Sequence, residues 1–182
     1  MAAVELVILD RDGVINEDAP AFVRSAQAWQ PIPGSIEAIA RLAQRGIAVA
    51  VATNQSGIAR GLLDLTTLEA IHARMRAMVT AAGGRLDAVV FCPHGPDDGC
   101  TCRKPQPGLL QRIEAQLGVA CAGAPFVGDS LRDLQAGRAA GCRPVLVRTG
   151  NGRRTETEGV DADVAVFDDL AAFVDDLIGG GE

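Results

Sequence analysis

Short apolar runs alternate with amphipathic stretches along most of the 182-residue chain. The apolar runs predict buried strands at residues 4–9, 47–52, 86–91, 124–127, 145–147 and 163–167. Helical spacing of apolar residues predicts helices at residues 35–44, 66–82, 107–117, 130–140 and 169–177. Ser35 is the expected N-terminal cap of the first helix, and Thr66 with Glu69 forms a capping box for the second. Residues 13–33 contain three prolines and no regular period, which predicts an irregular loop.

The alternation of strands and helices predicts a parallel sheet covered on both faces. We therefore expect the α/β class: a Rossmann-like three-layer sandwich with a mainly parallel sheet of five to six strands. Residues 1–182 are expected to form a single domain, because no long segment is free to form a large cap domain. In such sheets ligands bind beyond the carboxyl ends of the strands. The residues that follow each strand are therefore the candidates for function.

Composition and charge narrow the class of protein. Hydrophobic residues make up 48% and charged residues 22%, as in globular domains rather than disordered chains. No apolar stretch approaches the ~20 residues that cross a bilayer, and Met1 does not open a secretory signal. The net charge of −6 argues against binding to nucleic acid or to anionic membranes. We expect a soluble, cytoplasmic monomer with no nucleic-acid or membrane partner.

Polar residues follow three of the predicted strands. Asp10 and Asp12 come directly after the first strand, and Gly13 permits a sharp turn there. Residues 53–57, Thr-Asn-Gln-Ser-Gly, follow the second strand and offer hydroxyl, amide and backbone N–H donors that suit phosphate oxygens. Asp129 follows the fourth strand. Taken singly, each group is equally compatible with the chemistry of a surface turn or a helix cap.

The chain has sixteen arginines and one lysine, Lys104. A lysine in a chain that otherwise uses arginine indicates a site that needs the compact ammonium of lysine rather than the planar guanidinium of arginine. Chance retention of a single lysine is the alternative interpretation. Lys104 precedes the predicted helix at residues 107–117.

Together these segments resemble the four motifs of the haloacid dehalogenase superfamily of phosphatases, in the order DRDGVIN, TNQSG, RKP and GDSLRD. The resemblance covers essentially the whole chain. It implies that Asp10 is the nucleophile and that Asp12 is the general acid and base. It implies that Thr53 and Lys104 hold the transferring phosphoryl oxygens. It also implies a magnesium ion held by Asp10, Asp129 and the backbone carbonyl of Asp12.

Three cysteines and a histidine lie within eleven residues of the chain. Cys92, His94, Cys100 and Cys102 offer three thiolates and one imidazole, a set that completes a tetrahedral zinc site. A complete site has no position for substrate, so we expect a structural zinc ion that stabilises the loop 92–102. Reduced cysteines without a metal are the alternative.

The cysteine loop narrows the resemblance further. A CPH…CxC loop directly before RKPQPG, together with TNQSGIARG, resembles the D-glycero-D-manno-heptose-1,7-bisphosphate 7-phosphatases, whose near relatives are histidinol-phosphate phosphatases. The resemblance to the heptose-bisphosphate phosphatases implies that the protein removes the 7-phosphate from a small phosphorylated sugar. It also implies a role in heptose synthesis for lipopolysaccharide or surface polysaccharide. The substrate contacts that it implies are Asp18, Asn54, Gln55, Ser56, Arg60 and Arg103. Ser130 departs from the group, because relatives often carry a lysine after the aspartate of the fourth motif.

Three other functions remain open. A histidinol-phosphate phosphatase would use the same catalytic residues, and kinetic comparison of the two substrates distinguishes the two enzymes. A polynucleotide 3′-phosphatase carries similar motifs, but the charge of −6 and the lack of a basic, aromatic-lined groove count against it. A catalytically inactive, zinc-stabilised binding module is disfavoured because all four motif positions are intact.

Overall fold

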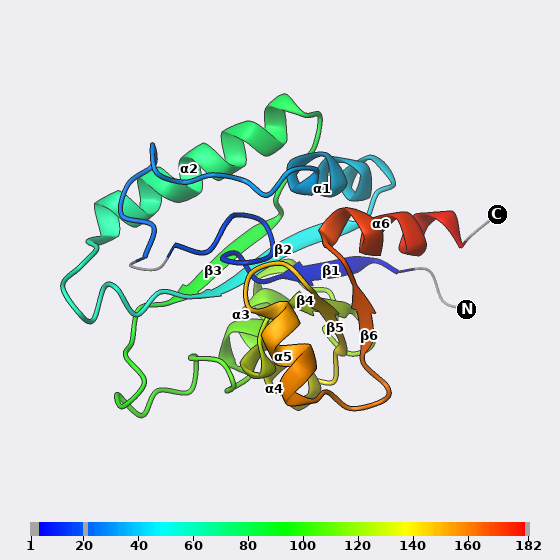
Figure 1. Ribbon diagram of the computed structural model, residues 1–182. Helices are drawn as coiled ribbons and strands as arrows, with labels where there is room; N and C mark the ends of the chain where they lie inside the picture. The colour runs from blue at the N-terminus through cyan, green and yellow to red at the C-terminus, as the bar shows by residue number, and fades with distance from the viewer. Residues whose placement is uncertain (1–3, 20–21, 181–182) are drawn as a thin grey trace.

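The computed structural model of the protein describes residues 4–19 and 22–180. Six strands in these residues form one parallel sheet in the order β3-β2-β1-β4-β5-β6 (Figure 1). The strands are β1 (Leu6–Leu9), β2 (Ala48–Asn54), β3 (Ala88–Cys92), β4 (Pro125–Gly128), β5 (Arg143–Val147) and β6 (Ala165–Phe167). The predicted α/β class and parallel sheet are therefore confirmed.

Helices cover both faces of the sheet and make the predicted three layers (Figure 1). Helices α1, α2 and α6 pack on one face, and α3 and α4 pack on the other. Helix α5 lies against β5. The helices are α1 (Ser35–Gln44), α2 (Leu65–Ala81), α3 (Gly108–Leu117), α4 (Leu131–Ala139), α5 (Gly152–Glu158) and α6 (Leu170–Gly179).

The core has an apolar layer on each face of the sheet. In β1, Val7 and Leu9 pack toward α1, α2 and α6, whereas Leu6 and Ile8 pack toward α3 and α4. Both faces of the strand are buried, which explains its near-continuous apolar sequence. The strand order reverses between β1 and β4, because β2 and β3 lie on one side of β1 and β5 and β6 lie beyond β4. This reversal is where parallel sheets open a crevice for ligands.

Two predicted helix caps are wrong. Ser35 is the first residue of α1 rather than its cap, and its hydroxyl donates to the carbonyl of Ile15 at 2.6 Å. Helix α2 begins one residue before Thr66, because the carboxylate of Asp64 accepts a hydrogen bond from the N–H of Thr67 at 2.7 Å. A carboxylate satisfies the free N–H groups at the start of a helix and favours its positive end.

Helix α5 has no counterpart in the sequence prediction. Its seven residues contain no apolar period, so its position depends on tertiary contacts. Arg148 at the end of β5 pairs with Glu156 at 2.7 Å, and the hydroxyl of Thr155 donates to the carbonyl of Asp129 at 2.9 Å. These contacts fix α5 beside the carboxyl ends of the central strands.

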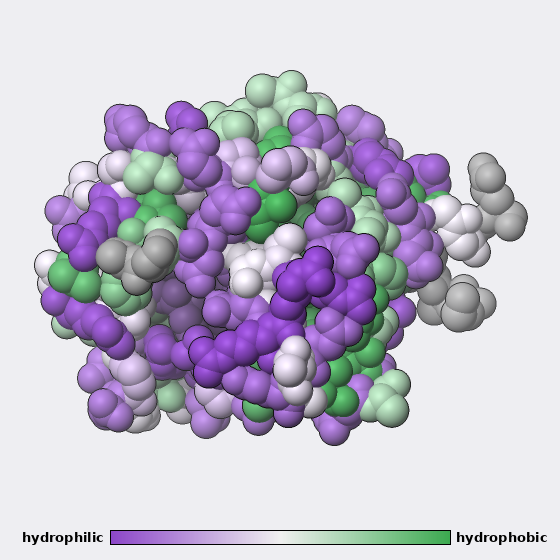
Figure 2. Space-filling model, viewed as in Figure 1, coloured by the Kyte–Doolittle hydropathy of each residue, from purple (hydrophilic) through white to green (hydrophobic). Residues whose placement is uncertain are grey.

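The segment between β1 and α1 is irregular, as predicted. Within its described residues, isolated bridges join Asn16 to Asp12 and to Pro31, without a helix or strand. None of the helices in residues 4–19 and 22–180 has the length and apolar content to cross a membrane. On the face drawn in Figure 2, hydrophilic residues predominate.

Candidate active site

The carboxyl ends of β1, β2 and β4 meet at a cavity of about 270 Å³. Nine of the ten residues predicted to act in catalysis or to contact substrate line it, and so does the predicted metal ligand Asp129. Gln55 is the exception. The lining residues are Asp10, Asp12, Asp18, Phe22, Thr53, Asn54, Ser56, Arg60, Arg103, Lys104, Asp129, Ser130, Arg132, Asp133 and Asn151.

Lys104 is buried at the base of this cavity. Its ammonium lies 2.7 Å from the carboxylate of Asp10, 2.8 Å from that of Asp133 and 2.9 Å from the carbonyl of Ala52. Burial alone would lower the pKa of Lys104, but the charges of Asp10 and Asp133 raise it above its usual value. Asn54 fixes the backbone of Lys104: it accepts from its N–H at 3.0 Å and donates to its carbonyl at 3.1 Å. Lys104 is therefore a charged ammonium held beside Asp10.

Asp10, Asp129 and Asp133 form a cluster in which one carboxylate oxygen of each lies within 4.8 Å of the others. Burial, and then the charge of Asp133, raises the pKa of Asp10 despite the nearby Lys104. The same two causes raise the pKa of Asp129 to about 7. Burial would also raise the pKa of Asp133, but Lys104 lowers it. Three carboxylates face one ammonium, so ionisation of all three would leave two negative charges without a counterion. A divalent cation would supply that missing charge.

Two loops hold the carboxylate of Asp129 in place. The backbone N–H and the side-chain amide of Asn151 donate to its Oδ2 at 2.8 and 3.2 Å. A Cβ atom would lie 2.1 Å from this oxygen at Gly13 and 2.3 Å from it at Gly150, and both glycines have positive φ. Only glycine fits these two positions. Within the described residues, nothing donates to the Oδ1 of Asp129, which leaves that oxygen for a cation.

Asp12 accepts hydrogen bonds from three side chains. Arg11 donates to it through Nε and Nη2, and the amides of Asn16 and Gln55 each donate at 2.9 Å. Burial would raise the pKa of Asp12, but the Arg11 charge and these hydrogen bonds lower it. The carboxylate is therefore ionised. Arg11 is fully buried, and its Nη1 donates a hydrogen bond to Nε2 of His72 at 3.1 Å. Burial of His72 and the charge of Arg11 lower the pKa of His72 to about 3, so the imidazole is neutral.

Thr53, Asn54 and Gln55, at the end of β2, have different surroundings. Thr53 is 1% exposed and borders the cavity. The Gln55 amide donates to the hydroxyl of Thr53 and to the carboxylate of Asp12, both at 2.9 Å, so its side chain orients two predicted catalytic groups. Substrate contact by Gln55 stays a prediction, because its side chain is buried outside the cavity lining.

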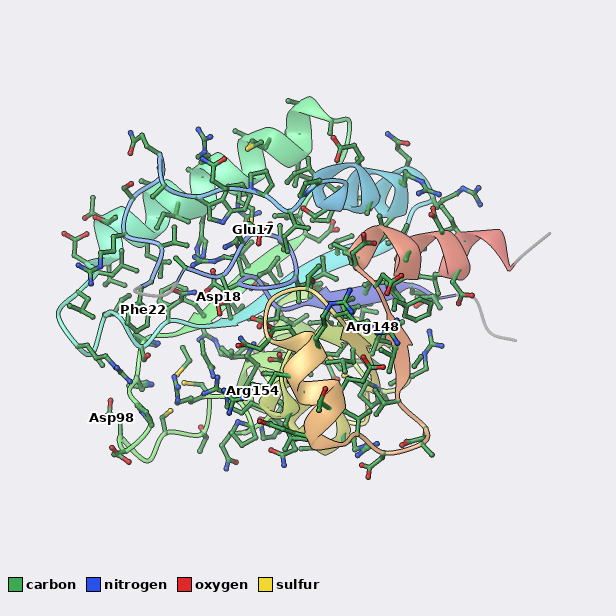
Figure 3. All side chains as sticks on the ribbon, in the orientation of Figure 1. Glu17, Asp18, Phe22, Asp98, Arg148 and Arg154 are labelled. Carbon is green, nitrogen blue, oxygen red and sulfur yellow. The ribbon has the colours of Figure 1, made fainter. Side chains whose placement is uncertain are left out.

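Asp18, Phe22 and two arginines lie at the mouth of the cavity. Figure 3 shows Asp18 and Phe22 in the loop that follows β1, with Asp98 further away at the tip of the cysteine loop. The guanidinium of Arg60 lies 5.7 Å from the centre of the Phe22 ring. Arg103 also lines the cavity, and its guanidinium donates to the carbonyl of His94 at 3.3 Å. The mouth is therefore basic, whereas the base of the cavity is acidic.

The four predicted zinc ligands come together beside this mouth. The Sγ atoms of Cys92, Cys100 and Cys102 and the Nδ1 of His94 lie within 4.8 Å of one another. The Sγ of Cys92 lies 3.7 Å from that of Cys100 and 3.1 Å from that of Cys102. Two thiolates bound at ~2.3 Å around a tetrahedral zinc ion are ~3.7 Å apart, so the first pair matches that spacing and the second is closer. Three thiolates and an imidazole are the ligand types that zinc selects.

Among the residues of the site to which the sequence assigned no role are Arg11, Arg132, Asp133 and Asn151. Asp133 lies one helical turn after Asp129, and that spacing was the available signal for it. Asn151 follows β5, and the rule that ligands bind beyond strand ends points to it as well. Nothing local marks Arg11 or Arg132, because their roles depend on the packing of α2 and α4 around the crevice.

Comparison with known proteins agrees with this geometry. Residues 101–173 match the family model described as HAD-hydrolase-like. The D-glycero-β-D-manno-heptose-1,7-bisphosphate 7-phosphatase of Pseudomonas putida is 55% identical over 96% of this chain and 100% of its own length. That of Bordetella bronchiseptica is 54% identical over 96% of this chain and 98% of its own length.

Solved structures give the same result. The D,D-heptose 1,7-bisphosphate phosphatase from B. bronchiseptica, complexed with magnesium and phosphate, aligns with a TM-score of 0.94 at 53% identity, covering 98% of this chain and all of the other. The enzyme from Burkholderia thailandensis aligns with a TM-score of 0.75 at 46% identity, covering 96% and 98%. The chain therefore belongs to the haloacid dehalogenase-like hydrolases, in the family of the D-glycero-β-D-manno-heptose-1,7-bisphosphate 7-phosphatases.

Proposed function

We propose that the protein is a magnesium-dependent phosphatase that removes the 7-phosphate of D-glycero-D-manno-heptose 1,7-bisphosphate. The observation that carries this proposal is the 2.7 Å contact between Lys104 and Asp10, beneath a cavity whose mouth is lined by arginines. Relatives of full length whose names state this reaction support it. We further propose that the reaction occurs in the cytoplasm, in heptose synthesis for lipopolysaccharide or surface polysaccharide.

Asp10, Asp129 and the backbone carbonyl of Asp12 are the proposed magnesium ligands. Carboxylate and carbonyl oxygens are the ligands that Mg²⁺ prefers. With its three carboxylates ionised and Lys104 protonated, the cluster would have two negative charges in excess, which match the charge of the ion. When bound, the ion neutralises charge between an anionic nucleophile and an anionic phosphate ester. The B. bronchiseptica structure is of a complex with magnesium and phosphate, which supports the same cofactor here.

Asp10 is the proposed nucleophile. Its carboxylate attacks phosphorus in line, the bond to the sugar oxygen breaks, and an aspartyl-phosphate forms. Lys104 orients Asp10 and, with the hydroxyl of Thr53, binds the phosphoryl oxygens as their charge develops. A water molecule then cleaves the acyl-phosphate and regenerates the carboxylate of Asp10.

Asp12 is the proposed acid and base. It donates a proton to the departing sugar oxygen in the first step and accepts one from the attacking water in the second. The ionised carboxylate held by Arg11, Asn16 and Gln55 is the form that the second step requires. The first step requires the protonated form, and the negative charge of a bound phosphate shifts the pKa of Asp12 in that direction.

We propose that Cys92, His94, Cys100 and Cys102 hold a structural zinc ion. The first ligand ends β3 and the last directly precedes Arg103 and Lys104 in the chain. The ion would therefore fix the segment that carries Lys104 relative to the sheet. Its contribution is to stability and to the position of Lys104, since all four coordination positions are filled by protein.

We propose that Arg103 binds the phosphate that is retained, with Arg60 on the other side of the mouth. Both line the cavity, and a guanidinium binds phosphate in bidentate fashion. Asp18, Asn54 and Ser56 are the proposed partners of the sugar hydroxyls, because their polar side chains line the same cavity.

The test is the release of phosphate from a panel of substrates, followed by ³¹P NMR in the presence of Mg²⁺. The panel contains both anomers of heptose 1,7-bisphosphate, fructose 1,6-bisphosphate and histidinol phosphate. We expect the highest kcat/KM for a heptose bisphosphate, with loss of the 7-phosphate signal and retention of the 1-phosphate signal. A higher kcat/KM for histidinol phosphate would identify the alternative enzyme instead.

A further inference from the structure

Three guanidinium groups gather at the mouth of the cavity: those of Arg60, Arg103 and Arg132. In the described part of the chain, none of the three forms an ion pair with a carboxylate. By contrast, Arg138 and Arg148 elsewhere on the surface each pair with two acidic residues. The mouth therefore holds positive charge that no neighbouring side chain neutralises.

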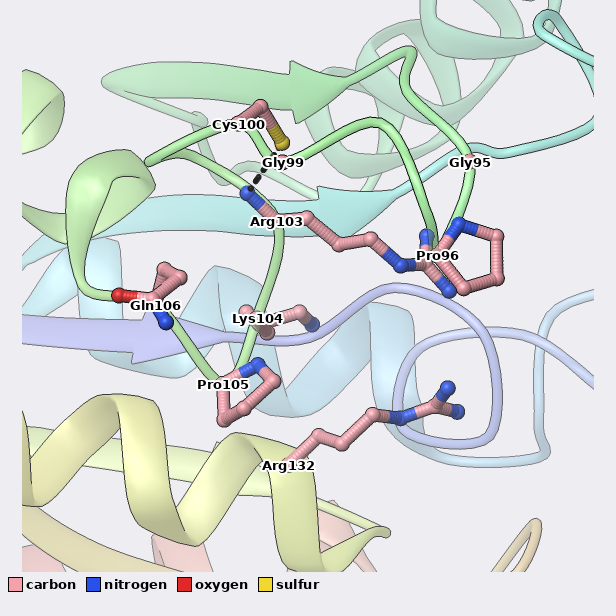
Figure 4. A pocket seen from close by; sticks show the side chains of 9 residues that line it. All are labelled: Gly95, Pro96, Gly99, Cys100, Arg103, Lys104, Pro105, Gln106 and Arg132. Carbon is pink, nitrogen blue, oxygen red and sulfur yellow. Dashed lines mark hydrogen bonds between the residues drawn. The ribbon is translucent and has the colours of Figure 1, made fainter.

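Arg132 and Arg103 border a second hollow that adjoins the catalytic cavity. This hollow has a volume of about 290 Å³ and shares Arg103, Lys104 and Arg132 with the catalytic cavity. Figure 4 shows the side chains of Arg103 and Arg132 extending in the same direction from opposite sides of Lys104. Arg60 does not line this second hollow. The two arginines therefore form a pair beside the phosphoryl site, separate from Arg60.

The position of Arg132 is electrostatically unfavourable without an anion. Arg103 and Arg132 line the same two hollows, and two like charges that share a site repel each other. Arg132 also lies in the first turn of α4, where the helix dipole disfavours a cation. A dianion between Arg103 and Arg132 would convert both repulsions into attractions.

We propose that Arg132 determines specificity for a bisphosphorylated sugar, by binding the phosphate that is not hydrolysed together with Arg103. This inference rests on the proposed function, because Lys104 and Asp10 must hold the reacting phosphate while Arg132 holds the other. Lys104, Arg103 and Arg132 line both hollows, so one substrate molecule could contact Lys104 with its reacting phosphate and the arginine pair with the other.

The experiment compares two substrates that differ only in the retained phosphate: heptose 1,7-bisphosphate and heptose 7-phosphate. Arg132→Gln removes the charge of an exposed side chain that has no ion pair in the described residues, so we expect the variant to fold. Arg132→Lys keeps the charge without the planar fork. Arg153→Gln, on the exposed surface of α5 and outside both hollows, is the control for the change in net charge.

Arg132→Gln is expected to lower kcat/KM for the bisphosphate about tenfold through a higher KM, the loss that corresponds to one charge-assisted hydrogen bond at a solvent-accessible site. Its kcat/KM for heptose 7-phosphate should stay at the wild-type value. Arg132→Lys should lie between the two, and Arg153→Gln should match wild type on both substrates.

Two results would overturn the role of Arg132 while leaving the proposed function intact. One is a fall in the kcat/KM of Arg132→Gln that is equal for both substrates. The other is that the wild-type enzyme prefers the bisphosphate and Arg132→Gln keeps the same preference. Failure of the wild-type enzyme to hydrolyse either substrate would instead refute the proposed function itself. The wild-type measurement therefore separates the two claims.

Discussion

Replacing Lys104 with methionine removes the only ammonium side chain that faces three buried carboxylates. Methionine has a similar length and no charge, so the change removes the charge with little change in volume. Lys104 is 2% exposed and contacts Asp10 at 2.7 Å and Asp133 at 2.8 Å. Both carboxylates would lose their cationic partner while remaining out of water.

The expected loss follows from the burial of these groups. Breaking a buried ion pair by removing one partner costs about 3–5 kcal/mol, because the remaining charge stays desolvated. Unfolding free energies of single domains are about 5–15 kcal/mol, so the loss is a large fraction of the total. With a urea m-value of about 2 kcal/mol/M, the unfolding midpoint should fall by about 1.5–2.5 M.

The assay is urea unfolding of the magnesium-free protein at pH 7, followed by circular dichroism. Arg85→Met is the matched control, because Arg85 is half-exposed and its pair with Asp87 should contribute about 1 kcal/mol or less. Lys104→Arg keeps the charge and provides a folded variant if Lys104→Met does not fold. A loss in Lys104→Met no larger than that in Arg85→Met would refute the argument that Lys104 compensates the buried carboxylates.

Two further predictions concern the metals and pH. Chelation of zinc from the metal-loaded protein should lower its melting temperature by several degrees, because a stability loss of about 1 kcal/mol corresponds to ~2–4 °C for a protein of this size. Calorimetry combined with metal analysis would check this prediction. An unchanged melting temperature after complete removal of zinc would contradict a stabilising zinc loop. The pKa of Asp129 is raised to about 7, so the folded, magnesium-free protein binds a proton that the unfolded chain lacks between about pH 4 and 7. The free energy of unfolding of the wild-type protein should therefore fall from pH 5.5 to 7.5 relative to that of Asp129→Asn, and Mg²⁺ should reverse that fall. If the two proteins show parallel stability curves against pH without Mg²⁺, the pKa of Asp129 is not raised.

The sheet and most of the site could be predicted from sequence because both follow from local patterns. A buried parallel strand must be apolar on both faces, as β1 is, and the residue after such a strand must lie at the carboxyl edge. Asp10 and Asp129 directly follow β1 and β4, and Thr53 lies at the carboxyl end of β2; these three strands prove to be neighbours in the sheet. To predict that these residues meet at one cavity, only the order of the strands in the sheet was needed in addition to the sequence.

The features that could not be predicted depend on contacts between distant elements. Helix α5 lacks an apolar period. It is held by the ion pair of Arg148 with Glu156 and by the hydrogen bond from Thr155 to the carbonyl of Asp129, a residue 26 positions earlier in the chain. Gln55 turns inward because Asp12 and Thr53 offer it two acceptors, a choice that its position in a polar loop does not specify. Arg132 lines the mouth because the start of α4 lies beside the segment that carries Arg103 and Lys104, far from it in the sequence.

The most direct test of the account is the turnover of Asp10→Asn with heptose 1,7-bisphosphate and saturating Mg²⁺. The amide fills the same volume but cannot attack phosphorus, so we predict no phosphate release above background by ³¹P NMR. Circular dichroism and zinc content should match the wild-type protein. Phosphate release by the folded variant at a rate close to that of wild type would contradict the assignment of Asp10 as the nucleophile, and with it the proposed mechanism.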